Sequence, residues 1–311
     1  MKLLRLVPEV TKIQFMRWRK ISFPLSGAVA IASLALFFMV GLNFGIDFKG
    51  GTLLELRSMQ GPANLAQVRT TLSGLKLGDV QVQEFGEPEE VLIRIESQEG
   101  HEQSSQVVVS KVREALGQNY EFRRTEVVGP RVSGELATKG FLAVAISLVM
   151  ILFYIWFRFE WQFAAGAIIT TFNDIVFTIG FFSLFQLDFS LSSIAAVLTI
   201  IGYSLNDTVV VYDRIRENLR RYKKMQLEEL LDLSINETLS RTTMTSATTL
   251  LALLALYFFG GEVIQSFVLA MIVGVVVGTY SSIFLAAPLL ILLGLRTSVF
   301  NSNRDDEPKK A

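Results

Sequence analysis

Long uncharged stretches alternate with charged segments along the chain. A helix needs about 20 apolar residues to cross the hydrocarbon core of a bilayer. We predict six membrane-spanning helices, at residues 21–43, 140–157, 161–185, 189–212, 242–259 and 263–295. The first stretch is too long for a signal peptide, and its flank does not resemble a small-residue cleavage site. The hydrophobic pattern therefore predicts a polytopic α-helical membrane protein.

The pattern changes between the first and second predicted helices. Apolar residues have helical spacing at 64–75 and 104–116, and strand character is found at 52–57, 80–85, 91–95 and 120–128. The resulting order, βαββαβ, is that of the ferredoxin-like split pattern. We therefore predict one α+β domain of ferredoxin-like fold in this part of the chain.

These elements divide the chain into five parts. We predict an N-terminal arm at 1–20, the first membrane helix at 21–43, the α+β domain at 44–138, a five-helix membrane bundle at 139–295 and a C-terminal tail at 296–311.

The distribution of Lys and Arg predicts the orientation of these parts. Basic residues gather in the arm, in the tail and at 214–224, whereas the short loops 186–188 and 260–262 contain none. Basic loops stay on the cytoplasmic side of a membrane. Both termini are therefore predicted to be cytoplasmic, with the α+β domain on the far side.

Composition limits the chemistry that these parts can perform. The chain has no cysteine, one histidine and a formal net charge of +0. Disulfides and thiolate metal sites are therefore excluded, and the balanced charge argues against nucleic acid or another polyanionic partner. His101, beside Glu102, is interpreted as a solvated loop residue rather than a ligand. With no phosphate-binding loop motif either, we predict neither an enzyme nor a bound cofactor or metal.

Two carboxylates interrupt the predicted membrane helices, Asp174 in the third and Asp207 in the fourth. Because a charge at the bilayer centre costs about 2.5–3.5 kcal/mol on insertion scales, an intramembrane carboxylate indicates function. Asp174 lies on a stripe with Thr170 and Thr178. The alternative is that these residues only hold helices together through hydrogen bonds, and that alternative suits Asp174 better than Asp207.

Asp207 follows a run of polar residues that contains Tyr203, Ser204 and Asn206. A turn that is polar on nearly all sides cannot face lipid, so we predict that it packs inside a bundle.

Arg241, at the entrance of the fifth helix, begins a polar face that continues at Thr245. We predict that Asp207 pairs with Arg241. Together with Asp174, this pair is predicted to couple proton movement to work, because buried carboxylates are the usual proton carriers in membranes.

Two further patterns concern packing. Small residues recur at every fourth position of the sixth helix, at Ala270, Gly274, Gly278, Ser282 and Ala286. This spacing allows another helix to approach closely and needs no chemical role. Residues 225–239 carry apolar residues on one face, which predicts an interfacial elbow that enters the fifth helix.

Four runs of residues resemble the SecF family: Phe44–Thr52, Phe157–Trp161, Ile201–Thr208 and Asp213–Asn218. SecF is the smaller subunit of the SecD–SecF accessory complex of the bacterial Sec translocase. The resemblance implies half of a resistance-nodulation-division type bundle in the bacterial inner membrane, which SecD completes. It also implies that the proton motive force helps to pull or release preproteins on the periplasmic side, beside the SecYEG channel and with YajC. On this resemblance, Asp207 is the family's proton-transporting aspartate and Arg241 is its associated arginine.

Two other functions stay open at this point. The chain could be a non-transporting scaffold that stabilises the translocase and holds an inert buried ion pair. It could also be the half-subunit of a proton-coupled exporter, although the small α+β domain argues against that function.

Overall fold

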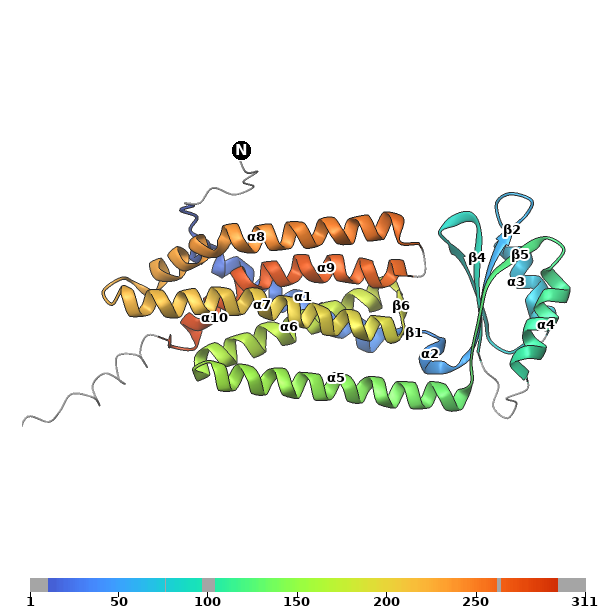
Figure 1. Ribbon diagram of the computed structural model, residues 1–311, viewed down its shortest axis with the longest axis horizontal. Coiled ribbons are helices and arrows are strands. Elements are labelled where there is room, and N and C mark those ends of the chain that lie inside the picture. The colour runs from blue at the N-terminus through green and yellow to red at the C-terminus, as the bar shows by residue number, and fades with distance from the viewer. Residues whose placement is uncertain (1–10, 76, 97–103, 262–263, 296–311) are drawn as a thin grey trace, which may run out of the picture. The chain divides into compact units, whose positions relative to one another are not determined.

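The computed structural model describes residues 11–75, 77–96, 104–261 and 264–295, so His101 lies outside it. The chain divides into two compact units. The first unit comprises residues 1–42, 146–187 and 195–311, and the second comprises residues 43–145 and 188–194. Figure 1 shows the helices that build the first unit and the sheet that builds the second.

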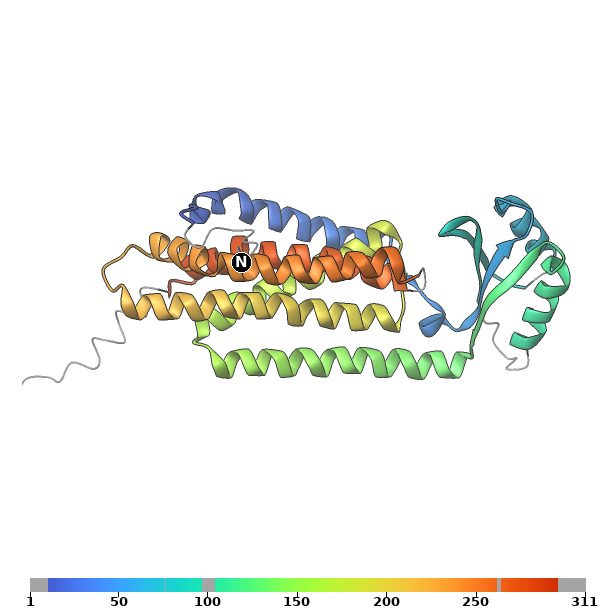
Figure 2. The same ribbon diagram turned by 45° about the horizontal axis from the view of Figure 1, so that its top comes forward.

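The predicted membrane helices are present as helices. Among the described residues, six are long and apolar enough to cross a membrane. They are η1–α1 (Phe15–Trp18 and Arg19–Met39), α5 (Pro130–Arg158), α6 (Trp161–Phe185), α7 (Leu191–Arg221), α8 (Leu227–Phe259) and the run α9–η3–α10 (Gln265–Ser281, Ser282–Ala286 and Ala287–Leu292). In two views, α6, α7, α8 and α9 run alongside one another (Figures 1 and 2).

The predicted interfacial elbow at 225–239 is wrong. Residues from Leu227 onward are the first part of α8, which is one continuous helix to Phe259. Leu230, Leu231 and Ile235 are buried in the main core of the bundle. Neighbouring segments supply partners for the polar residues of this stretch, so it packs into the bundle instead of lying on a membrane surface.

The last membrane helix is bent by Pro288. Proline has no N–H group, and its ring clashes with the carbonyl group four residues earlier in a regular helix. A π-helical turn, η3, occupies Ser282–Ala286 just before it. Two carbonyl oxygens of this stretch accept hydrogen bonds from other helices: Ser22 Oγ donates to Phe284 O at 2.9 Å, and Tyr212 Oη donates to Ala286 O at 3.0 Å.

The small residues of α9 face α7. A Cβ atom added at Gly274 would overlap the side chain of Ile200, and one added at Gly278 would lie 3.0 Å from Cβ of Ser204. Ala270 and Ser282 are also buried. Close approach of α7 and α9 therefore depends on these residues being small.

The second unit contains a four-stranded antiparallel sheet of order β3-β4-β2-β5. Its strands are β2 (Gly51–Ser58), β3 (Val80–Phe85), β4 (Glu87–Glu96) and β5 (Tyr120–Val128). Helices α3 (Leu65–Gly74) and α4 (Ser104–Leu116) pack on one face of the sheet (Figure 1). Val68 and Leu72 of α3 and Val112 and Leu116 of α4 share a single core with the strands. All the predicted strands and helices of this segment are therefore present in the predicted order.

A second, parallel sheet was not predicted. It pairs β1 (Asn43–Phe44) with β6 (Asp188–Phe189). The short helix α2 (Ile46–Lys49) then leads to the glycine pair Gly50 and Gly51, whose φ angles are +73° and +135°. A Cβ atom at Gly51 would overlap the carbonyl oxygen of Ile95, so only glycine allows β2 to begin here.

Candidate functional site

Asp174 is held by hydroxyl groups from two other helices. Its side chain, on α6, is 1% exposed. Oδ2 accepts hydrogen bonds from Ser204 Oγ of α7 at 2.5 Å and from Ser281 Oγ of α9 at 2.8 Å, whereas Oδ1 accepts none. The predicted neighbours Thr170 and Thr178 instead donate to backbone carbonyl groups of α6. Asp174 therefore joins three membrane helices.

Asp207 lies one helical turn after Ser204 on α7 and is 3% exposed. Its Oδ2 atom accepts no hydrogen bond from the part of the chain that the structure describes. Arg241 is the charged residue whose field acts on Asp207. Arg241 is an exposed residue of α8, and within the described part of the chain no ion pair joins the two side chains. Arg241 thus acts on Asp207 through its charge, and a direct pair between the two side chains stays a prediction.

The polar turn of α7 is buried on one side only. Ser204, Asp207 and Thr208 face the bundle, whereas Gly202 and Asn206 are exposed. This chain therefore provides the predicted packing inside a bundle on one side of the turn, and the packing of the other side stays a prediction. Because Gly202 and Asn206 are four residues apart, they share one face of the helix. This exposed face continues toward the start of α7 at Thr199 and Ala195.

A chain of hydroxyl groups crosses three helices beside this turn. Tyr203 Oη of α7 donates to Ser246 Oγ of α8 at 3.2 Å, and Ser246 Oγ lies 2.8 Å from Thr279 Oγ1 of α9. Thr245, predicted as part of the polar shell, donates instead to the carbonyl group of Arg241 in its own helix. The polar surroundings of the site are thus provided mainly by serine and tyrosine on facing helices.

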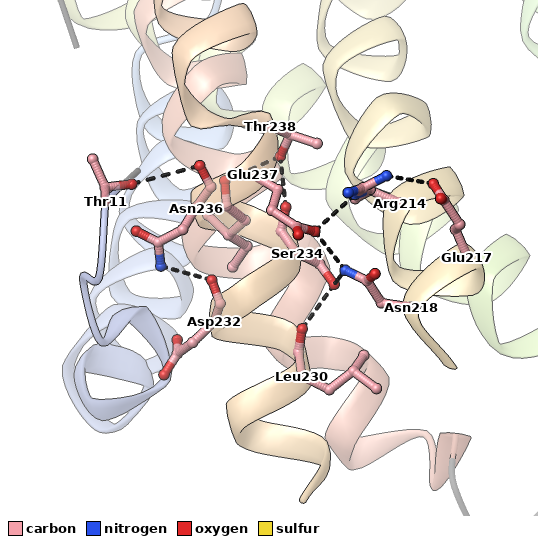
Figure 3. A network of polar contacts seen from close by, with 11 residues as sticks. Thr11, Arg214, Glu217, Asn218, Leu230, Asp232, Ser234, Asn236, Glu237 and Thr238 are labelled. Atoms are coloured by element: carbon pink, nitrogen blue, oxygen red, sulfur yellow. Dashed lines mark hydrogen bonds and ion pairs between the residues drawn. The ribbon is translucent and has the colours of Figure 1, made fainter. Parts of the chain in front are cut away.

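The charged end of α7 is fastened to the first turns of α8 (Figure 3). Arg214 Nε donates to Glu237 Oε2 at 2.7 Å, and Asn218 Nδ2 donates to Glu237 Oε2 at 2.7 Å and to Ser234 Oγ at 3.0 Å. On its other side, α8 holds the N-terminal segment through Asn236, which accepts from Ile13 N at 3.0 Å. These contacts fix the stretch of α8 that precedes Arg241.

The opposite end of α7 begins in the second unit and is held there by three contacts. Asp47 Oδ2 accepts from Leu191 N, the first residue of α7, at 3.0 Å. Phe189 O accepts from Gly45 N at 2.9 Å. Asp188 forms an ion pair with Arg94 of β4, whose side chain is only 7% exposed. Burial lowers the pKa of Arg94 from its ordinary value, which reflects the cost of removing a guanidinium from water.

Sequence reasoning missed several of these residues. Ser281 is next to the predicted packing residue Ser282, but no sequence pattern indicates toward which neighbouring helix its side chain points. Asp47 lies within a family-like motif, yet its bond to Leu191 joins positions that are 144 residues apart in the chain. No group of three His, Cys, Asp or Glu residues that could hold a metal ion occurs in the described ranges.

Comparisons with known proteins place these features in a family. The profile of the C-terminal region of the SecD/SecF protein export membrane proteins matches residues 108–296, and that of the SecD/SecF GG motif matches residues 35–58. The GG motif region thus includes Gly50 and Gly51.

Individual relatives agree over nearly the whole chain. The protein translocase subunit SecF of Cereibacter sphaeroides is 45% identical, over 94% of this chain and 93% of the relative. The protein translocase subunit SecDF of Brucella abortus is 49% identical over 94% of this chain. The crystal structure of SecDF from a Thermus species has a TM-score of 0.84 at 34% identity and covers 93% of this chain.

The two SecDF proteins are much longer than this chain, which spans 39% of the Brucella protein and 40% of the Thermus chain. Six apolar helices and the match to SecDF together show that the chain is a polytopic helical membrane protein. With a SecF protein matched over 93% of its length and both family profiles present, this chain belongs to the SecF branch of the SecD/SecF family of protein export membrane proteins.

Proposed function

We propose that this chain is the SecF subunit of the bacterial protein-export machinery. With SecD, it uses the proton motive force to promote preprotein translocation and release on the periplasmic side of the SecYEG channel, with YajC as a further partner. It resides in the inner membrane with both termini in the cytoplasm, and its role is transport rather than enzymatic catalysis. Its second unit is a periplasmic domain of ferredoxin-like fold, which the strand order β3-β4-β2-β5 with two helices on one face supports.

The observation that carries this proposal is the pair of buried carboxylates in the bundle. Asp174 and Asp207 are almost fully buried, and each has a buried oxygen that finds no hydrogen-bond partner among the described residues. Neither carboxylate forms an ion pair in the described structure. A carboxylate in this setting alternates readily between its charged and neutral forms when a proton gradient is applied. Ser204 donates to Asp174 and lies one turn from Asp207 on the same helix, so it connects the two positions.

Association with SecD is supported by the composition of two exposed helix faces. The exposed face of α5 carries large apolar side chains, as expected for contact with lipid; examples are Phe141, Val149, Phe153 and Trp156. The exposed face of α7 is small and polar, with Ala195, Thr199, Gly202 and Asn206. Small residues let a second membrane helix approach closely, and Asn206 would gain a polar partner there. This face also lies beside Asp207, so a SecD helix would complete the proton site.

The structure also supports a route from the proton site to the periplasmic domain. The carboxylates act on α7, and the first turn of that same helix is bound to the domain through Asp47 and Asp188. A shift or rotation of α7 would therefore be transmitted directly to β4 and to the segment before the glycine pair.

The scaffold function is the second candidate, because Asp174 already joins three helices and would serve cohesion without titrating. Preprotein export by cells or by reconstituted SecD–SecF complex, measured with and without a proton gradient, separates the two functions. Asp207→Asn should assemble with SecD normally but lose the gradient-dependent part of export, Arg241→Met should behave similarly, and Asp174→Asn should have a milder effect.

Asp213→Asn is the matched control for this experiment. Asp213 lies on the same helix, but its side chain is 43% exposed and already paired with Arg158. It should retain gradient-dependent export. Normal export by Asp207→Asn under a full gradient would rule out proton coupling at this residue and leave the scaffold function.

A further inference from the structure

A basic surface pocket lies where the N-terminal arm meets the first membrane helix. The pocket has a volume of about 590 Å³ and is lined by Lys12, Gln14, Arg17, Trp18 and Ile21. It contains two cations, a side-chain amide, an indole ring and an aliphatic side chain. None of these described lining residues is acidic.

The two cations of the pocket have no carboxylate partner among the described residues, although acidic residues lie nearby. Glu228 is paired with Arg19 at 2.6 Å, and Asp232 accepts a hydrogen bond from Met16 N at 2.9 Å. These carboxylates are therefore already engaged. Lys12 and Arg17 are exposed and remain available to an external anion.

The backbone around the pocket is fixed before any ligand binds. Phe15 and Met16 are buried in the bundle core. Asn236 both accepts from Ile13 N at 3.0 Å and donates to Ile13 O at 2.8 Å. With Ile13, Phe15 and Met16 anchored in the protein, the next two residues, Arg17 and Trp18, are exposed. A preorganised site loses less conformational entropy on binding.

The surroundings of the pocket indicate the kind of anion. Trp18 is 56% exposed, and Ile21 and Leu25 extend the exposed surface along α1 with exposures of 59% and 53%. Tryptophan favours the level of the lipid headgroups, and aliphatic side chains beyond it favour the acyl chains. A ligand with a phosphate at one end and a hydrocarbon chain at the other would match both parts.

We propose that Lys12, Arg17 and Trp18 bind the headgroup phosphate of an anionic phospholipid, with an acyl chain lying along Ile21 and Leu25. The two cations neutralise the phosphate diester, and the amide of Gln14 and the indole N–H of Trp18 are further donors for the headgroup. A juxtamembrane cation contributes about a fivefold preference for anionic lipid. Two cations together should therefore give a preference of about thirtyfold over a zwitterionic lipid.

The test uses quenching of Trp18 fluorescence in the full-length chain in lipid nanodiscs. The other two tryptophans, Trp156 and Trp161, are on α5 and α6 and are replaced by phenylalanine. Brominated phosphatidylglycerol should quench Trp18 at a much lower mole fraction than brominated phosphatidylcholine. Lys12→Gln and Arg17→Gln should each reduce this preference about fivefold, and the double variant should nearly abolish it.

Arg19→Gln is the matched control, because it removes the same charge from a neighbouring residue that is already paired with Glu228. General attraction between the protein and the membrane surface would respond equally to Arg17→Gln and Arg19→Gln, and that outcome would overturn the site. An unchanged preference in the double variant would overturn it as well. Addition of inorganic phosphate should leave quenching by phosphatidylglycerol intact. Loss of that quenching would assign the pocket to free phosphate instead of a lipid.

Discussion

The ion pair between Arg94 and Asp188 offers a direct test of how α7 is attached to the second unit. Asp188→Asn keeps the shape of the side chain but removes its charge. Among the described residues, Arg94 would then be left almost buried with Asn43 Oδ1, at 3.4 Å from its Nη1 atom, as its remaining acceptor. We expect the contacts at the start of α7 to open more often in this variant.

The magnitude follows from the burial of the two partners. Removal of one member of a buried ion pair costs about 3–5 kcal/mol. Asp188 retains 29% of its side-chain exposure and Asn43 still contacts the guanidinium, so we expect the lower end, about 3 kcal/mol. That loss corresponds to an increase of about two orders of magnitude in the population of the open state. The ion pair between Lys49 and Glu96 is a control, since its side chains are 47% and 40% exposed. Glu96→Gln should cost at most about 1 kcal/mol.

Amide hydrogen exchange in the purified full-length chain measures this opening. The informative amides are Gly45 N, which donates to Phe189 O, and Leu191 N, which donates to Asp47 Oδ2. Both should exchange about a hundred times faster in Asp188→Asn and only a few times faster in Glu96→Gln. Equal exchange rates in the two variants would show that the buried pair does not hold the start of α7. The double change Arg94→Met with Asp188→Leu should restore protection, because it removes both charges together.

Three further outcomes test other parts of the structure. Gly274→Ala should destabilise the purified chain by about 1–3 kcal/mol, because the added methyl group would overlap Ile200. Gly202→Ala, on an open face of α7, should not destabilise it. Equal melting temperatures of the two variants would show that the close packing of α7 and α9 is incidental. The segment 52–128 should fold alone, with helix and strand in its circular-dichroism spectrum. Burial, and then the charge of Glu90, raise the pKa of Glu55, so the folded segment binds this proton more tightly than the unfolded chain. Its stability should therefore fall as pH rises above 4.5 through the raised pKa, and urea titrations of Glu55→Gln should lack that component. Cysteines introduced one at a time into this cysteine-free chain should react with an impermeant reagent only from the periplasm at 260–262 and only from the cytoplasm at 214–224; the reverse pattern would invert the topology.

The sequence was sufficient to predict the six membrane helices and the elements of the α+β segment because each has a strong periodic signal, whereas the short elements β1, α2 and β6 were not predicted. Uncharged runs located the six membrane helices, and two helical and four strand patterns located the elements of the α+β segment. The residues at which the helices begin and end were harder to predict. Charged residues are tolerated in α8 before Thr242 because Arg214, Asn218 and the N-terminal segment pair with them, and such pairing depends on the tertiary structure.

The two carboxylates of the site could be predicted from the sequence, but the side chains that contact them could not. Asp174 and Asp207 stand out in an apolar sequence, because the free-energy cost of placing a carboxylate in the bilayer must be offset by some other interaction or by function. Which hydroxyl meets which carboxylate depends on the rotation of each helix about its axis, and a shift of one residue turns a side chain by about 100°. Ser281 was therefore missed, and the direct pair of Arg241 with Asp207 stays a prediction.

The bend in the last membrane helix is determined by residues of more than one helix. Pro288 disrupts the backbone ladder, but Ser22 of α1 and Tyr212 of α7 occupy two of the carbonyl groups at the break. With donors from two other helices in place, the break behaves as a fixed corner and not as a flexible hinge. The information that specifies this one bend is therefore spread over three helices, and α10 acquires its direction only when the bundle is assembled.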